Sequence, residues 1–416
     1  MKKFITVFIL LSILAFPAFA QLSFSGIVGA GATILKGTIN PGGSPGAGGF
    51  LWGRLQVNAQ NEKGTLGALL RIKVGMDVMD NHFSWSWYDP NDWANVNPYA
   101  WAWWKPVEQF KIQLGFIDDF AVSEIVAWGF NGNDAEDYIA LAGYDYTSNI
   151  FHRATGFYNG TWWTGASISV KPIPELAINL AIPYQLGNKP GKTAADVYLR
   201  MHGQITYTIQ GIGRAALSFE GKGDGKLTPQ PIWDTSDTPF GIGNANASTL
   251  YASFYLRALE QFGIGLNAGF AYTLPSKDSD ISYYSPMAMG LGFSFDRGKF
   301  GVRLRMAASF AGKAEKEGSD TYKEPFKLGI GVNPSYDFGV CKVFFNAGIS
   351  FTAKNNFENG SGLPIENPSA FGWHLNPYVT KRIGPGTIYG GFQLESDASN
   401  NKMIRWGIPI AVQFEL

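Results

Sequence analysis

The side chains best suited to acid–base or metal chemistry are scattered along this chain. Its four histidines lie far apart in the sequence: His82, His152, His202 and His374. No paired-histidine metal motif accompanies them. Asp224-Gly225 and Ser276–Asp280 carry oxygen ligands but lack the loop pattern of an EF-hand calcium site. The single cysteine, Cys341, excludes an internal disulfide and a cysteine-based metal cluster. The sequence predicts no enzyme, no cofactor and no metal site. A hydrolase that brings serine or aspartate to a histidine in space is a distant alternative.

Charge is distributed in a more informative way. Ten basic residues occupy the polar parity of segments in which polar and apolar residues alternate: Arg54, Arg71, Lys73, Lys111, Arg200, Arg214, Arg303, Arg305, Lys327 and Arg405. Acids gather between Ile112 and His152, where there is no lysine or arginine, and the first of them are Asp118, Asp119 and Glu124. A basic wall that faces an acidic loop across a narrow aqueous gap would create a strong transverse field. The alternative is that these charges form solvated outer surface.

Tryptophan is concentrated in one region, with six of the 13 between residues 85 and 104. Three of them stand among aspartates and asparagines: Trp85, Trp87 and Trp93. Flat aromatic faces beside carboxylates and amides could form a sugar-binding mouth, whereas the simpler reading is a loop that packs its own apolar plug. Three other aromatics share the apolar parity of the next segment: Tyr99, Trp101 and Trp103. We expect these three to face outward in an interfacial girdle.

Alternation of side-chain character shows which elements position these residues. In Met403–Leu416 every second residue from Trp406 onward is apolar, and the other parity is polar, small or proline. Leu66–Val78 and Phe300–Phe310 alternate in the same way, as do most other segments. Successive side chains of a strand point to opposite faces, so each segment has one apolar and one polar face. Many such strands in one chain are typical of a transmembrane antiparallel up-and-down β-barrel.

The connections between these segments alternate between short and long. Short ones, such as Asn61–Gly64 and Asp296–Lys299, contain glycine or proline, whereas residues 79–97, 117–135 and 222–249 form long ones. We expect about 18 strands, within a range of 16 to 20, with the pair around 138–158 the least certain. Barrels of roughly 16–18 strands leave an aqueous channel. Short turns and both termini are expected in the periplasm.

The N-terminus predicts export. Lys2 and Lys3 precede an apolar run and the small-residue site Ala18-Phe19-Ala20, so residues 1–20 read as a cleaved signal peptide and 21–416 as one domain. The apolar run is too short to serve comfortably as a membrane anchor. The near-neutral charge gives no indication of a nucleic-acid partner. A secreted β-sandwich or propeller is the soluble alternative, but no repeat of a propeller blade is visible.

With its signal site, repeated hairpins and closing strand Arg405–Leu416, the chain resembles the outer-membrane porins of diderm bacteria. The hairpin from Tyr99 through Lys105-Pro106 to Gly115 adds to this likeness. The resemblance implies a passive channel for small hydrophilic solutes (ions, with sugars as a further option) and an acidic loop folded inward. It implies outer-membrane lipid as the surroundings, recognition of Arg405–Leu416 by the barrel-assembly machinery, and a homotrimer as one option. The alternative function is an occluded barrel whose long outer loops serve as an adhesin.

Overall fold

The protein is almost entirely β-strand. The computed structural model describes residues 21–39, 46–79, 82–84, 99–117, 163–183, 201–220, 249–274, 276–278, 281–284, 287–310, 313–316, 321–323, 326–353, 355–358, 364–367, 370–396 and 404–415. One 3-10 helix, η3 (Glu260–Phe262), interrupts the strands in these ranges. Among the described residues there is no helix with the length and apolar character needed to cross a membrane.

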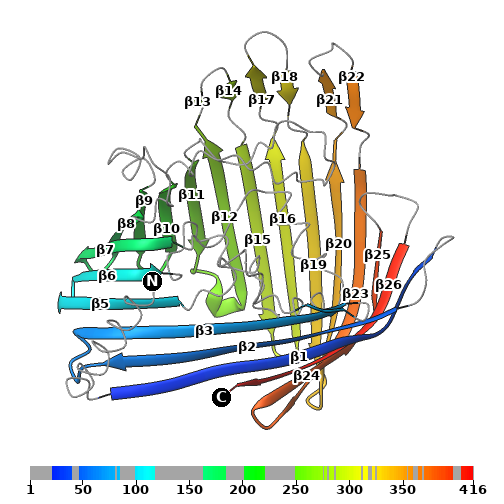
Figure 1. The fold of residues 1–416 in the computed structure, drawn as a ribbon, viewed down its shortest axis with the longest axis horizontal. Coiled ribbons are helices and arrows are strands. Elements are labelled where there is room, and N and C mark those ends of the chain that lie inside the picture. The colour runs from blue at the N-terminus through cyan, green and yellow to red at the C-terminus, as the bar shows by residue number, and fades with distance from the viewer. Residues whose placement is uncertain are drawn as a thin grey trace.

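One sheet of 20 strands makes up the body of the molecule. In chain order these strands are β1 (Gln21–Ile39), β2 (Gly46–Gln60), β3 (Leu66–Met79), β4 (His82–Ser84), β5 (Tyr99–Val107), β6 (Phe110–Ile117), β7 (Trp163–Ile173), β8 (Leu176–Pro183), β9 (His202–Ile209), β10 (Gly213–Glu220), β11 (Thr249–Leu256), β12 (Ile264–Thr273), β15 (Met287–Arg297), β16 (Phe300–Phe310), β19 (Lys327–Asp337), β20 (Lys342–Thr352), β23 (Ala370–Ile383), β24 (Gly386–Gly391), β25 (Gln393–Ser396) and β26 (Ile404–Glu415). Neighbours in the chain pair antiparallel, and β1 pairs with β26, so the sheet closes on itself (Figure 1).

The closed ring has fewer positions than strands. β4 and β5 pair with different parts of the same edge of β3, so together they occupy one position of the ring. β24 and β25 likewise share one position, because both pair with β23 on one side and β26 on the other in the same register. The 20 strands therefore fill 18 positions, which confirms the predicted up-and-down barrel of about 18 strands. β6 pairs directly with β7, so the uncertain pair around 138–158 adds no strand to the ring; those residues lie outside the described part of the chain.

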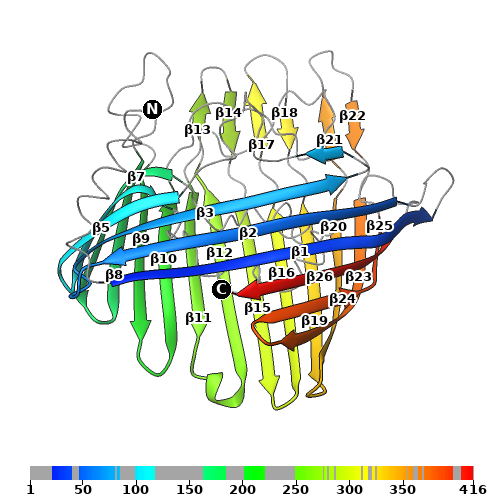
Figure 2. The ribbon, with the colours of Figure 1, turned by 60° about the horizontal axis from the view of Figure 1, so that its bottom comes forward.

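Short and long connections lie at opposite ends of the barrel, as the sequence predicts (Figure 2). Above the long-loop end rise a four-stranded sheet, β13 (Ser276–Asp278), β14 (Ile281–Tyr284), β17 (Lys313–Lys316) and β18 (Thr321–Lys323), and the pair β21 (Asn355–Glu358) and β22 (Pro364–Asn367). Gln21 pairs with Gln60, just before a short turn, and Phe414 pairs with Gly386, just after another. The start of β1 and the end of β26 therefore lie at the short-turn end.

Pro409 lies inside the strand that closes the ring, where a missing N–H would interrupt a regular ladder. The register between β1 and β26 shifts at this point: Thr33 pairs with Pro409 and Leu35 with Ile408, which leaves Ile34 as an extra residue. On the other side of β26, the paired residues stop at Ile410 and resume at Gly407. The proline thus lies opposite a β-bulge of β1, where the ladder is already interrupted and a missing N–H is tolerated.

Gly263 ends the turn between β11 and β12 with a φ of 75°. Its carbonyl accepts a hydrogen bond of 2.7 Å from the Asp296 N–H of β15, and a Cβ at this position would collide with the Asp296 carbonyl oxygen. Gly298, in the next short turn, has a similar φ of 61° but open space around its Cα.

We predict that Gly263→Ala is the more costly of two otherwise similar substitutions. Gly298→Ala adds only the strain of a positive φ, roughly 1 kcal/mol in the free energy of unfolding. Gly263→Ala adds a backbone collision to that strain, and we expect a loss of roughly 3 kcal/mol. Urea titration followed by heat-modifiable electrophoretic mobility measures both. Equal losses for the two variants would contradict the packing described for Gly263.

Candidate functional site on the inner wall

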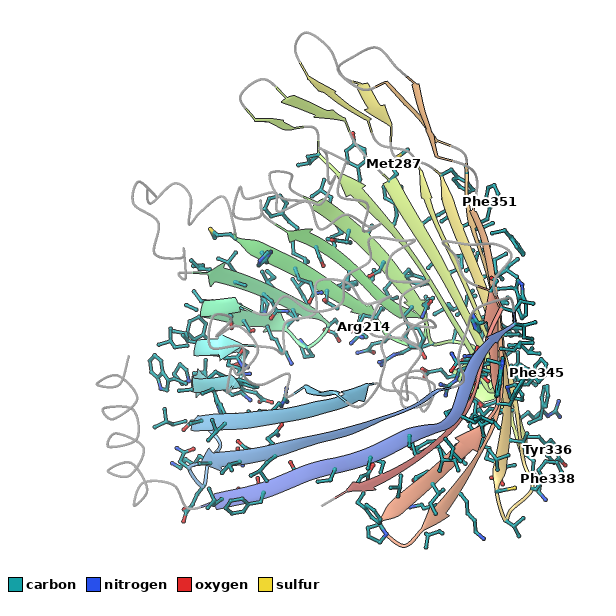
Figure 3. The ribbon with its side chains drawn as sticks, turned by 45° about the vertical axis from the view of Figure 1, so that its right-hand side comes forward. Arg214, Met287, Tyr336, Phe338, Phe345 and Phe351 are labelled. Carbon is teal, nitrogen blue, oxygen red and sulfur yellow. The ribbon has the colours of Figure 1, made fainter. Side chains whose placement is uncertain are left out.

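The two faces of the barrel wall differ in chemistry. Large apolar side chains such as Leu217, Leu291 and Phe345 are exposed on the outer face. Figure 3 shows Phe345 and Tyr336 on the outside of the ring and Arg214 on the side that faces the enclosed space. The opposite parity carries buried polar side chains, such as Ser218 beside Leu217 and Asn346 beside Phe345. Apolar side chains outward and polar ones inward is the arrangement expected of a barrel whose outside meets lipid.

The predicted basic residues lie on this polar parity but do not form one patch. Arg54 and Lys73 are directly paired across β2 and β3, and Arg71 follows two residues along. Lys111 is half-buried on β6, with β5 between it and β3. The others are spread around the ring: Arg214 on β10, Arg303 and Arg305 on β16, Lys327 on β19 and Arg405 on β26. Arg200 lies outside the described residues. Their role in the wall remains a prediction.

Arg71 has the best-defined surroundings of the predicted bases. Its Nε donates a hydrogen bond of 3.0 Å to Oε1 of Gln56, its partner residue on β2. Its guanidinium carbon lies 5.6 Å from the ring centre of Trp101 on β5. A guanidinium over an aromatic face is attracted by the ring quadrupole. The contact holds this charge against the aromatic ring, and Arg71 is half-buried.

The outward prediction for the tryptophans of β5 is wrong. Trp101 pairs with Leu69 and Trp103 with Gly67, which places both on the parity of Arg71. Trp101 is only 4% exposed, and a Cβ at Gly67 would overlap the Trp103 ring, so that ring lies over the glycine on the inner face. The backbone of Tyr99 pairs with Arg71 and shares this parity. Trp104, at 52% exposure, is the aromatic of this hairpin that faces outward.

Two groups of predicted residues lie outside the described part of the chain. They are the acids of the proposed constriction loop, Asp118, Asp119 and Glu124, and the tryptophans of the proposed mouth, Trp85, Trp87 and Trp93. The structure does place the ends of both segments. β6 ends at Ile117 and β7 begins at Trp163 on the neighbouring strand, so residues 118–162 leave and return at adjacent points of the long-loop rim.

Uncharged hydrogen-bonding groups dominate the buried polar residues of the described inner face. They are Gln113, Ser167, His202, Gln204, Thr206, Ser218, Ser253, Asn267, Ser294, Asn333, Ser335, Asn346, His374, Asn376, Gln393 and Ser396. Some are joined across strands: Ser167 Oγ donates to Gln113 Oε1 at 3.0 Å, and Gln204 accepts from Asn179 and donates to Ser218, both at 3.3 Å. Unlike the charged residues, these neutral side chains are not conspicuous in the sequence. Their place on the polar parity was the available signal.

The two described histidines face inward, as their parity indicates. His202 and His374 are both buried among the polar side chains of the inner face. His374 pairs with Gly348, and a Cβ at that glycine would overlap the imidazole, so the ring lies over the neighbouring strand. Within the described ranges, no group of three or more histidine, cysteine or acidic side chains could hold a metal ion. Cys341 lies in the short turn before β20.

Comparisons with known proteins show the fold. The chain is similar to a BenF-like porin from Pseudomonas fluorescens Pf-5, with a TM-score of 0.55 and 11% identity over 96% of this chain and 99% of that one. It is similar to Pseudomonas aeruginosa OpdQ, with a TM-score of 0.53 and 9% identity over 96% and 98%. OpdK of the same species, solved with vanillate, gives a TM-score of 0.52 and 10% identity over 96% and 99%.

This is the fold of an outer-membrane porin. Neither a protein-family model nor a curated protein sequence matches the chain. Identities of 9–11% mean that the likeness lies in the barrel and not in particular side chains. The inner wall of this protein therefore has to be read from its own residues.

Proposed function

We propose that the protein is a passive channel of the outer membrane, with its short turns and both termini in the periplasm. One observation carries this proposal: 18 strand positions close into a ring with apolar side chains outside and polar ones inside. Rings of roughly this strand number enclose an aqueous lumen rather than a filled core. Such a channel needs no chemistry, because width, wall charge and mouth geometry set what passes.

The porin fold of the similar structures favours a channel over the occluded adhesin. It equally favours a non-enzymatic role, since a channel needs no nucleophile or base. The solutes that we propose are small and hydrophilic, ions first and sugars as a further option. The surrounding partners are outer-membrane lipid, the assembly machinery through Arg405–Leu416, and two further copies if the protein forms a trimer.

Conductance measurements test the channel. The full mature chain, reconstituted in a planar bilayer, should raise the ionic current in discrete, equal steps. The same preparation in liposomes should admit sugars at rates that fall with their size. A folded, inserted protein that gives neither current steps nor sugar entry would contradict the proposal.

The finer proposal is that the segment after β6 folds into the lumen and narrows it. Support comes from its length, its attachment to two adjacent strands, and its acids, which Asp118, Asp119 and Glu124 begin. These carboxylates would face the basic residues Arg54, Arg71 and Lys73 across a narrow aqueous gap. Low-dielectric walls would focus the electric field between the two sets of opposite charges.

We predict that neutralising the three acids changes ion preference. The triple variant Asp118→Asn, Asp119→Asn, Glu124→Gln removes the negative side of the gap, so the cation-to-anion permeability ratio should fall by roughly threefold. Reversal potentials in a salt gradient measure this ratio. Glu62→Gln, in an exposed short turn at the other end of the barrel, is the control and should leave the ratio unchanged. An unchanged ratio in the triple variant would remove the constriction proposal but not the channel.

A further inference from the structure

Four carboxamides stand side by side on the inner wall, one on each of four successive strand positions. Asn346 of β20 pairs directly with Asn376 of β23. The unshifted register between β19 and β20 places Asn333 opposite Asn346. The common register of β24 and β25 on β23 places Gln393 opposite Asn376. Neighbouring strands lie about 4.8 Å apart, so this amide row extends roughly 15 Å around the wall.

The amide row contains polar atoms that lack partners. All four side chains are buried, from 9% exposed at Asn333 to 0% at Asn376. Within the described parts of the chain, Oδ1 of Asn333 and both polar atoms of Asn376 have no hydrogen-bond partner. Both ring nitrogens of His374, two residues before Asn376, are likewise without one. Buried polar groups in folded proteins are almost always satisfied by protein, water or ligand. These atoms therefore need a partner that the described chain does not supply.

The chemistry of the unpartnered atoms indicates which partner fits. A carboxamide offers both donors and an acceptor, and a neutral imidazole offers one of each. A hydroxyl group also donates and accepts, so a row of hydroxyls can satisfy every group in this set. An anion only accepts, which would leave the carboxamide oxygens unsatisfied.

An aromatic pair lies directly beside the amide row. Phe344 and Tyr378 are two residues along the same strands from Asn346 and Asn376, and their rings stack at 4.6 Å with 4° between planes. Tyr378 is buried, whereas Phe344 is half-buried, with Lys342 Nζ 4.9 Å from its ring centre. Amides that bind hydroxyls next to an apolar aromatic surface suit a molecule with polar edges and apolar C–H faces.

We propose that the amide row, with His374 and Phe344, binds neutral polyhydroxylated solutes of mono- to disaccharide size as they pass. This inference rests on the proposed channel function and names its solute class. Charged residues adjoin the row without belonging to it: exposed Arg303 lies opposite Asn333, Lys342 Nζ lies 4.9 Å from the ring centre of Phe344, and Glu395 pairs with His374. The row itself is uncharged, so affinity should follow the number of hydroxyls rather than the charge of the solute.

Sugar-dependent current through the reconstituted full chain tests the proposal. Glucose and sucrose should reduce the wild-type ion current saturably, and gluconate should bind more weakly than glucose. Asn346→Leu and Asn376→Leu should each raise the half-saturating sugar concentration by about tenfold, because each removes hydrogen bonds to the solute. The matched control is Asn179→Leu, which removes a half-buried carboxamide from β8 on another part of the inner wall. It should leave the half-saturating concentration within about twofold of wild type.

The possible failures are distinguishable. Absence of current steps in the wild type would overturn the channel and this inference with it. Current steps with a sugar effect that never saturates would overturn the inference alone, as would equal effects of Asn376→Leu and Asn179→Leu. Tighter binding of gluconate than of glucose would show that the site prefers anions, and would also overturn the inference. The wild-type comparison of glucose with gluconate decides the matter even if a leucine variant does not fold.

Discussion

Leu217→Arg should prevent most of the protein from folding into a bilayer. Leu217 is 62% exposed on the outer face, near the middle of β10, and its neighbours in sequence point inward. An arginine at the middle of the lipid-facing band costs roughly 2–4 kcal/mol. That is a large part of the net stability of a typical domain, which is about 5–15 kcal/mol. Folded yield in lipid vesicles, followed by heat-modifiable mobility, measures the loss.

The control places the same charge one residue further along the strand. Ser218 faces inward, where its hydroxyl accepts a hydrogen bond from Gln204. Ser218→Arg gives up that bond, worth about 1 kcal/mol, but leaves the charge on the wet side of the wall. Its folded yield should stay close to that of the wild type. If both arginines were tolerated equally, the outer face of β10 would not contact lipid.

Ala411→Pro should disrupt closure of the barrel. Ala411 lies in β26, pairs with Gly31 on β1 and with Tyr389 on β24, and is 3% exposed. The pairing of β26 with β1 and with β24 is regular at this residue. A proline there removes a hydrogen-bond donor from the ladder and its ring clashes with the backbone, which lowers the free energy of unfolding by roughly 3 kcal/mol or more. Because β26 is the last strand of the ring, the loss would fall on the step that seals the cylinder. We expect little folded protein and no current steps.

Pro409→Ala is the matched substitution two residues away. The native proline already lies at the bulge between Thr33 and Leu35 of β1, where the ladder is interrupted. Restoring an N–H there should change the free energy of unfolding by less than about 1 kcal/mol. A loss as large as that of Ala411→Pro would show that the position of the bulge does not explain why the proline is tolerated.

Alternation along each strand was sufficient to predict the barrel, its two faces and its strand number. The inward position of Arg71, Arg214 and Arg303 follows from the same pattern, since a strand offers only two faces. Proline and glycine marked the short turns because few other residues suit those backbone angles. These features are local, and a single strand with its turns contains the information they need.

Trp101 and Trp103 show where local pattern fails. A tryptophan suits a lipid interface and equally suits a glycine or a guanidinium on the inner wall. The choice is made by the partner strand, through the pairing of Trp103 with Gly67 and of Trp101 with Leu69, close to Arg71. Register between strands depends on turn geometry and bulges, which the sequence does not reveal.

The amide row could not be predicted for the same reason. Asn333, Asn346, Asn376 and Gln393 are spread over 61 positions of the sequence, and none is distinctive alone. They become neighbours only when four registers are fixed together. A charged residue can be recognised from the sequence of a single strand. A row of neutral amides exists only once several strands are assembled side by side.

Thiol labelling tests most directly whether alternate side chains divide between water and lipid. Cys341 is the only cysteine, so Cys341→Ser gives a background free of thiols. Four variants of this background each carry one new cysteine. Two are at adjacent positions of β9, Tyr207→Cys and Thr208→Cys, and two at adjacent positions of β16, Arg303→Cys and Leu304→Cys.

The measurement is the reaction of each single-cysteine protein, inserted in a bilayer, with a charged and membrane-impermeant thiol reagent. We expect Thr208→Cys and Arg303→Cys to react and to lose conductance, because both positions face the lumen. Tyr207→Cys and Leu304→Cys should stay unlabelled, with unchanged conductance. Labelling of Tyr207→Cys and Leu304→Cys, with Thr208→Cys and Arg303→Cys left unlabelled, would contradict the arrangement of lipid outside the barrel and water inside it.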